Sequence, residues 1–118
     1  GSIEWVNAIF LFVNVGGRDY SNLFSEGGRH MSWFAGGRQD IDTPIIIRLL
    51  GPDAPPLLLF CRRQGHGGPP LPYVYCGHVG YIRHFPESHP VEVEWRLADA
   101  DVLAKSEHFQ ELLEGLPR

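Results

Sequence analysis

Glycines and prolines divide this chain into short apolar segments. Among its 118 residues are 14 glycines and 10 prolines. No apolar segment between them approaches the roughly 20 residues that are needed to cross a bilayer. Short segments rich in β-branched and aromatic residues are typical of strands. The spacing therefore predicts a domain built mainly of short strands, with no membrane partner.

Five strands are predicted, over residues 6–15, 30–34, 57–62, 73–82 and 91–97. In the fourth, Gly77 and Gly80 are predicted to mark a bulge or a bend. The fifth alternates clearly, which separates a core-facing set from a solvent-facing set. These two sets are Val91, Val93, Trp95 and Leu97 on the inside, and Glu92, Glu94 and Arg96 on the outside. Residues 18–28 and 63–72 are predicted to be loops.

Two short helices complete the prediction. Thr43 and Pro44 are suited to the N-cap and the first position of a helix that ends before Gly51. A second helix is expected to start at Asp99 or Asp101. The fold class is therefore predicted to be α+β: a strongly curved, partly closed β-barrel of about five to six strands with two short helices.

The length fits one domain. Gly1 and Ser2 are typical of a remnant of an expression tag, so we expect a single binding domain over residues 3–118 of a longer protein. Cys61 and Cys76 lie in apolar segments and are expected to be buried free thiols, with a disulfide or a metal pair as the alternative. This cysteine usage favours an intracellular protein, in the nucleus or the cytoplasm.

The formal net charge of −4 argues against a domain that binds nucleic acid by charge alone. The charges are unevenly distributed: six of the nine arginines lie before residue 64, and eight of the 14 carboxylates lie after residue 86. The folded domain is therefore expected to have one basic and one acidic face. Arginine suits planar and bidentate recognition, although a GC-rich genome would produce the same bias.

Nothing in the sequence predicts catalysis. The nucleophile-elbow, phosphate-loop and zinc-protease motifs are all missing. His66, His84 and His89 are expected to be solvated loop residues, with a metal site from His78, His84 and His89 as the alternative. Asp42 is better suited to helix capping than to a carboxylate pair with Asp40. We therefore expect no enzyme, no catalytic residue, no metal and no cofactor.

Aromatic and arginine residues cluster around two glycine-rich turns. Such a set can enclose a planar group and hydrogen-bond its polar edge, but the same rings could fill a small core. At least one of Trp33 and Phe34 must face inward, since they are neighbours in a strand. The expected base-pocket residues are Tyr20, Asn22, Phe24, Trp33, Phe34 and Gln39, and the expected phosphate contacts are Arg18, Arg38, Arg62 and Arg63. Tyr73 and Tyr75 share a strand face, where cross-strand packing is the simplest role.

A series of motifs resembles a domain of unknown function found at the C-termini of helicase-like and modification-dependent restriction proteins. The motifs are Tyr20-Ser21-Asn22-Leu23-Phe24, Ser32-Trp33-Phe34, Leu59-Phe60-Cys61-Arg62, Pro72-Tyr73-Val74-Tyr75-Cys76-Gly77 and Val93-Glu94-Trp95-Arg96-Leu97. The resemblance extends over about residues 9–113. That family is similar to the SRA and PUA-like groups of curved barrels.

The resemblance implies a non-catalytic reader of a modified base in duplex DNA. Such a reader would flip the base out of the helix, stack it on Trp33 or Tyr20, and hydrogen-bond its edge through Gln39 and Asn22. The alternative is a protein-interaction module of a larger regulatory or repair protein, with residues 65–70 and the C-terminal helix as its contact surface. In both cases we expect a monomer.

Overall fold

The computed structural model describes residues 2–15, 22–35, 39, 41–63, 71–85, 87–88 and 90–113. The strands are β1 (Ser2–Glu4), β2 (Ile9–Val15), β3 (Leu23–Ser25), β4 (His30–Phe34), β5 (Leu57–Arg63), β6 (Val74–Phe85) and β7 (Glu92–Leu97). The helices are α1 (Pro44–Leu50), α2 (Ala100–Leu103) and α3 (Glu107–Leu113), with a 3-10 turn, η1, over Glu26–Gly28.

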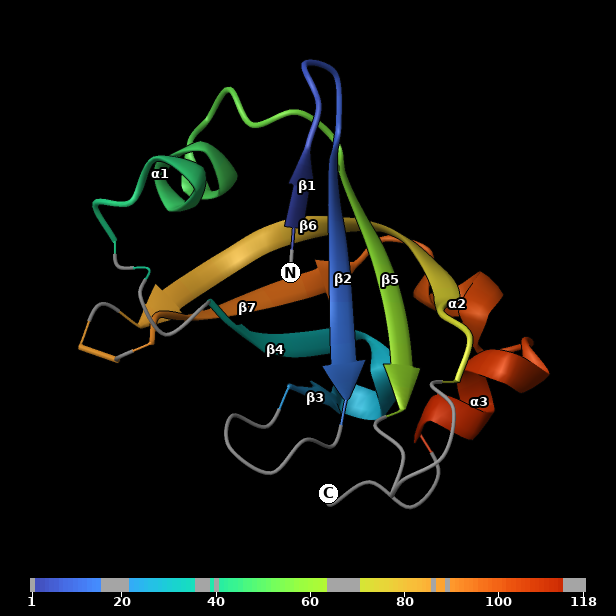
Figure 1. The fold of residues 1–118 in the computed structure, drawn as a ribbon. Coiled ribbons are helices and arrows are strands. Elements are labelled where there is room, and N and C mark those ends of the chain that lie inside the picture. Colours follow the sequence, from blue (N-terminus) through green and yellow to red (C-terminus); the bar gives the residue numbers. More distant parts are fainter. Residues whose placement is uncertain are drawn as a thin grey trace.

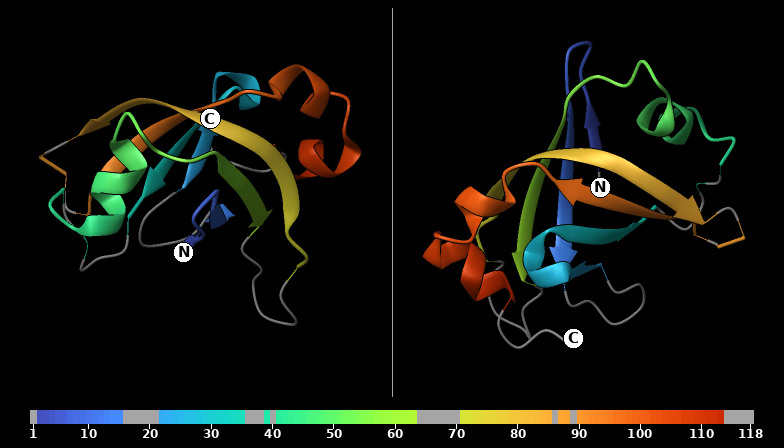
Figure 2. Two further views of the ribbon diagram at one scale, coloured as in Figure 1. Left: turned by 90° about the horizontal axis from the view of Figure 1, so that it is seen from above. Right: turned by 180° about the vertical axis from the view of Figure 1, so that it is seen from behind.

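The seven strands form one curled sheet in the order β1-β2-β5-β6-β7-β4-β3. Strands β2 and β5 are parallel, and all other neighbours are antiparallel. In Figure 1, β2 crosses in front of β6, β7 and β4 with β5 beside it, and Figure 2 shows β6 bending from one half of the sheet into the other. The sheet is a half-barrel, which confirms the prediction of a curled α+β sheet. The SRA-like and PUA-like assignment stays a prediction.

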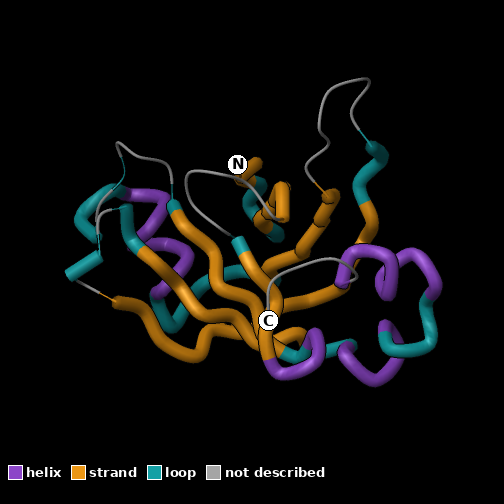
Figure 3. The backbone as a smooth tube through the Cα atoms, turned by 90° about the horizontal axis from the view of Figure 1, so that it is seen from below, coloured by secondary structure: helices purple, strands orange, loops and turns teal. Residues whose placement is uncertain are grey.

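Helices lie on opposite sides of this half-barrel, α1 on one side and α2 and α3 on the other (Figure 3). Helix α1 begins at Pro44, follows Thr43 at the N-cap and ends before Gly51, as predicted. It buries Ile46 and Leu49, and α3 buries its apolar side in the same core. The single C-terminal helix expected from the sequence is two short helices.

The core fills the space between the two halves of the sheet. The predicted inward residues of β7 and the residue before it are all buried: Val91, Val93, Trp95 and Leu97. Inward side chains of β2 and β5 pack against them from the other half: Ile9, Leu11, Val13, Val15, Leu57, Leu59 and Cys61. Glu94 lies on the outward side, as predicted, but is only 8% exposed and pairs with Arg83 across the strands.

A bulge at Gly77 sets the register of β6. Phe60 pairs with Tyr75 and Leu58 pairs with His78, so Cys76 and Gly77 together oppose one residue of β5. Gly77 has φ +78, a conformation that favours glycine. The extra residue lets Tyr75 and His78 both face outward while Cys76 and Val79 face the core. The predicted bulge is confirmed at this position.

Two strands were not predicted, β1 and β3, each three residues long. Strand β1 includes Ser2, which the sequence assigns to a tag remnant. Strand β3 lies inside the predicted loop 18–28. Strand β6 also extends to Phe85, beyond its predicted end at residue 82. Short edge strands have little periodicity of their own, so pairing with a neighbour defines them.

Gly77→Ala should destabilise the fold more than Gly27→Ala. Both glycines have positive φ, which costs an alanine roughly 1–2 kcal/mol. A Cβ at Gly27 would meet nothing within 4 Å, whereas one at Gly77 would collide with the Asp99 carboxylate. Chemical denaturation of both variants measures the difference. Equal losses of unfolding free energy would contradict the assigned role of the bulge.

Candidate binding site

The aromatic pair of β4 divides between the two sides of the sheet, as the sequence required. Trp33 is 5% exposed and packs in the core, with its ring centroid 6.4 Å from that of Trp95. Phe34 faces the opposite side and is half-buried. Trp33 therefore belongs to the hydrophobic core in this structure, and its ring is not presented to solvent.

The other described residues of the expected pocket also contact the protein itself. Phe24 lies edge-on against Phe109 of α3, at 5.2 Å between centroids. The Asn22 side chain donates to the Asn14 carbonyl at 3.1 Å and accepts from the Phe34 N–H at 2.9 Å. Asn22 thereby joins β2 to β4 across the open side of the half-barrel.

The structure brings Asn22 and Phe34 together, but it does not bring them together with Phe24 and Trp33 around one pocket. Gln39 is half-buried. The remaining expected contacts, Arg18, Tyr20 and Arg38, lie outside the described residues, as does the loop 65–70.

The two arginines that end β5 have different surroundings. Arg63 donates to the Glu111 carbonyl and so ties β5 to α3. Arg62 donates from Nε to the Asn14 side-chain oxygen at 2.7 Å. Its guanidinium carbon lies 4.4 Å from the centroid of the Tyr73 ring. A cation over an aromatic face is held in place electrostatically, so Arg62 has a defined position on the surface.

Beside Arg62 lies a cluster of rings that the sequence did not predict as a site. Cross-strand pairing places Phe12 opposite Phe60, and Phe60 opposite Tyr75. All are on the outward side, since their neighbours along each strand are in the core. We call this surface the aromatic face and define it by five side chains: Phe10, Phe12, Phe60, Tyr73 and Tyr75.

The five rings contact one another continuously. Phe12 stacks on Phe60 with centroids 5.1 Å apart and planes 19° apart. Tyr75 is tilted against Phe60 at 5.0 Å, and Tyr73 is edge-on to Phe12 at 5.2 Å. Phe10 completes the cluster, at 6.1 Å from Phe60. The tyrosines are the most exposed members, at 38% for Tyr73 and 50% for Tyr75.

The described strand positions around this face carry no carboxylate. Its register neighbours are Ile3, Asn14, Leu58, Arg62 and His78. The only permanent charge among these residues is the guanidinium of Arg62. The Asp99 carboxylate, which follows β7, lies 3.4 Å from the backbone nitrogen of His78.

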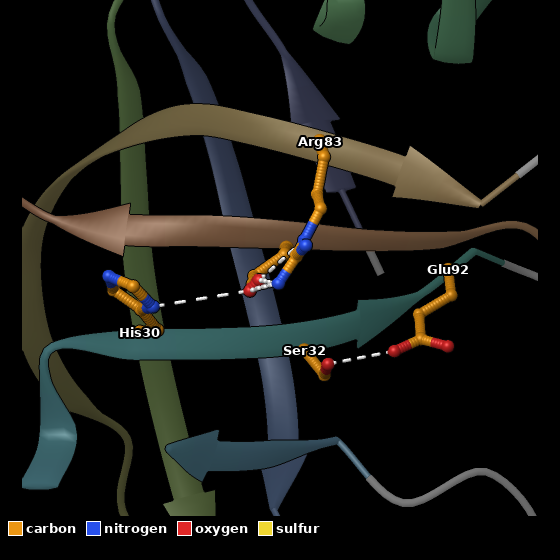
Figure 4. A network of polar contacts seen from close by, with 5 residues as sticks. His30, Ser32, Arg83 and Glu92 are labelled. Carbon is orange, nitrogen blue, oxygen red and sulfur yellow. Dashed lines mark hydrogen bonds and ion pairs between the residues drawn. The ribbon is translucent and has the colours of Figure 1, made fainter. Parts of the chain in front are cut away.

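Acidic side chains instead lie on the outward side of the other half of the sheet (Figure 4). Arg83 donates to Glu94 from Nε at 2.9 Å and from Nη2 at 3.2 Å. His30 Nδ1 lies 4.0 Å from the same carboxylate, and Ser32 donates to Glu92 at 2.8 Å. A two-point arginine–carboxylate pair across neighbouring strands has the geometry of a structural contact.

Neither the thiols nor the carboxylates of the described residues form a reactive centre. Cys61 and Cys76 are free and buried, as predicted. Burial raises the pKa of the Cys61 thiol well above its usual value, and the neighbouring Cys76 thiol raises it further. No group of three His, Cys, Asp or Glu side chains in the described part of the chain could hold a metal ion.

Comparison with models of known protein families and with curated proteins found no match to this chain. The resemblance given by the motifs is therefore still a prediction. Across the described residues, no helix combines the length and the apolar composition that spanning a membrane requires.

The aromatic face could have been found by comparing the two sides of each predicted strand. Residues 9–13 and 57–61 are apolar at every position. Such a segment fits a strand buried on both sides. In the half-barrel only one side of β2 and β5 contacts the core, so their outward rings stay partly exposed.

Arg83→Ala should leave the Glu94 carboxylate without its guanidinium partner in a position where the side chain is 11% exposed. We expect a loss of about 1–3 kcal/mol in unfolding free energy, the usual cost of an unsatisfied buried polar group. Replacing Glu94 by Gln in the same protein should recover part of the loss. Arg96→Ala, at an exposed position of β7, is the control. Equal losses for Arg83→Ala and Arg96→Ala would contradict this assignment.

Cys61 should resist thiol reagents until the protein unfolds. Because its pKa is raised in the fold, the thiol stays protonated there while the unfolded chain ionises near the ordinary pKa of about 8.5. The unfolded state then binds fewer protons, so the free energy of unfolding should fall as the pH rises above that value. Denaturation of the wild type and of Cys61→Ala, at pH values below and above the ordinary thiol pKa, measures this loss of unfolding free energy. An identical pH dependence of the two proteins would refute the prediction.

Proposed function

We propose that this domain is a non-catalytic module that binds nucleic acid through the aromatic face. One observation supports the proposal most: five aromatic side chains share an outward surface with a positioned guanidinium. Sheet surfaces of this composition stack bases in several kinds of nucleic-acid-binding domain, and arginine beside the rings contacts phosphate.

Tyr73 and Tyr75 are the rings best placed for contact, because they are the most exposed of the five. The ring of Phe12 supports Tyr73, and the ring of Phe60 supports Tyr75. A ring that is already held by a neighbour loses little conformational freedom when a ligand stacks on it. The phenylalanines would therefore position the tyrosines.

Arg62 would contact phosphate. Its Nε is hydrogen-bonded to Asn14 and its guanidinium lies over Tyr73, so its orientation is set before a ligand arrives. Arginine suits this role because its planar group can stack and donate hydrogen bonds at the same time. Arg63 is a weaker candidate than expected, since it ties β5 to α3.

The net charge of −4 does not oppose this arrangement strongly. Several described carboxylates are paired with arginines, as in Glu94 with Arg83, Glu4 with Arg48, and Asp101 with Arg29. None of these pairs lies on the aromatic face. The contribution of charge to binding should still be small, so stacking has to supply most of the affinity.

Recognition of a modified base stays a separate proposal that rests on the family resemblance. Such recognition would need a pocket. Of the described residues expected to line it, Trp33 lies in the core, Phe24 packs against α3, and Asn22 bridges two strands. Tighter binding of duplexes with a methylated or hydroxymethylated base than of the unmodified duplex would support that proposal.

A partner protein is the second candidate for the aromatic face. The observation in its favour is that Ile3, 50% exposed, lies next to Phe10 and extends the apolar surface. Protein interfaces are enriched in aromatic residues and arginine and depleted in lysine and carboxylates. The C-terminal helix, which the sequence suggested as the contact surface, exposes Glu107 and Glu111 but buries Phe109 and Leu112.

Tyr75→Ala should weaken binding of a fluorescently labelled oligonucleotide, measured by anisotropy. Removing a ring that stacks one base costs about 1–3 kcal/mol, which corresponds to a loss of about 5- to 150-fold in affinity. The matched control is Phe85→Ala, because Phe85 is a 38% exposed ring on the same strand but outside the aromatic face. It should bind as the wild type does.

Unchanged binding by a folded Tyr75→Ala protein would exclude stacking at this ring. If the wild-type domain binds no oligonucleotide at all, the nucleic-acid proposal is wrong and the protein-docking candidate takes its place. Circular dichroism of each variant separates a lost contact from a lost fold.

A further inference from the structure

We infer that the aromatic face takes a single strand with at least two neighbouring unpaired bases, and not a duplex. This inference rests on the proposed function and specifies its ligand. It follows from three properties of the face: the side of the sheet on which it lies, the spacing of its exposed rings, and the number of its cations.

The face lies outside the half-barrel. Inward neighbours such as Leu11, Leu59 and Cys76 are in the core, so the rings between them along each strand point away from it. A flipped base is held by walls on several sides, and in a duplex the flat faces of the bases are covered by their neighbours. The described residues around these outward rings supply no such walls. A flexible single strand can splay its bases over it.

Two exposed rings suit two successive bases. Tyr73 immediately precedes β6 and Tyr75 is its second residue, and both rings contact the outward phenylalanines of β2 and β5. Two residues of extended chain span roughly 6.6 Å. Tyr73 packs on Phe12 and Tyr75 on Phe60, and these two phenylalanines are stacked on each other. Bases that stack on both must be unstacked from each other, which a single strand allows at little cost.

The scarcity of described cations beside the rings allows only a small number of phosphate contacts. Arg62 is the only arginine or lysine among the described outward residues around the rings. Domains that grip a duplex neutralise many phosphates, and their affinity falls steeply with salt. For a single strand the logarithmic slope is about −0.7 per phosphate contacted. We therefore expect a slope near −1, which would identify binding dominated by stacking.

The experiment compares the whole chain on three labelled probes of one sequence: the single strand, the duplex, and a single strand in which two adjacent bases are replaced by abasic sites. We expect the single strand to bind at least about tenfold more tightly than either other probe. The double variant Tyr73→Ala/Tyr75→Ala should bind more weakly than either single variant, and because both rings belong to one cluster the two losses are not expected to multiply. Phe85→Ala is again the control.

Each outcome has a distinct meaning. Equal or tighter binding of the duplex overturns this inference and leaves the proposed function intact. Abasic sites without effect, or a double variant no weaker than the worse single variant, exclude a pair of stacked bases. A steep salt slope overturns the assignment of Arg62 as the principal phosphate contact. Absence of binding to every probe overturns the proposed function together with the inference.

Discussion

Strand β6 takes part in both halves of the sheet, and its irregularities decide which side chains reach the surface. It pairs with β5 near its start and with β7 along the rest of its length. Side chains of a regular strand alternate strictly between the two sides, so one extra residue exchanges the sides for everything that follows. The bulge at Gly77 makes this exchange between Tyr75 and Val79. A second shift, between Tyr81 and Arg83, brings Arg83 opposite Glu94. The aromatic face and the Arg83–Glu94 pair both depend on these two positions.

Curling explains why a domain of this size has apolar side chains on both sides of two strands. Because the sheet folds onto itself, the side chains on its inner side fill the interior. Of β2 and β5, only the inward positions contribute to that core. Three short helices cover parts of the core, and α1 and α3 contribute buried side chains such as Leu49 and Phe109 to it. Nothing in the core requires Phe10, Phe12 or Phe60 to be aromatic. Their partial exposure costs hydrophobic free energy, so a ligand that covers them is a reasonable source of compensation.

Most of the secondary structure could be predicted from the sequence, because it depends on local signals. The alternation in residues 91–97, the Thr43-Pro44 start of α1 and the glycine at the bulge are each legible without tertiary information. Strands β1 and β3 could not be predicted in the same way, since three residues carry too little periodicity and are defined by their partners. The closure of the sheet is likewise a property of long-range contacts, such as the one that Asn22 makes to both Asn14 and Phe34.

The candidate site was harder to predict for a different reason. The rings around the glycine-rich turns are close in sequence, which suggests a shared pocket. In a strand, however, the side of the sheet to which each side chain points decides which rings meet. Neighbouring residues such as Trp33 and Phe34 point to opposite sides, so a cluster along the chain is split by the sheet. Rings that are far apart in sequence, such as Phe12, Phe60 and Tyr75, meet because three strands place them in one row.

The effect of a charged residue also depends on the side of the sheet to which its side chain points. The chain is acidic as a whole, which argued from the sequence against nucleic acid, but the carboxylates of β7 face outward from the half of the sheet that does not carry the rings. Arg83 and His30 lie beside Glu94, while Arg62 lies beside Tyr73 and Asn14. A ligand on the aromatic face would meet the potential of that surface first, since charges beyond about 8–10 Å are screened at physiological salt. The side of the sheet on which a charge lies is therefore a better guide to the ligand than the net charge of the chain.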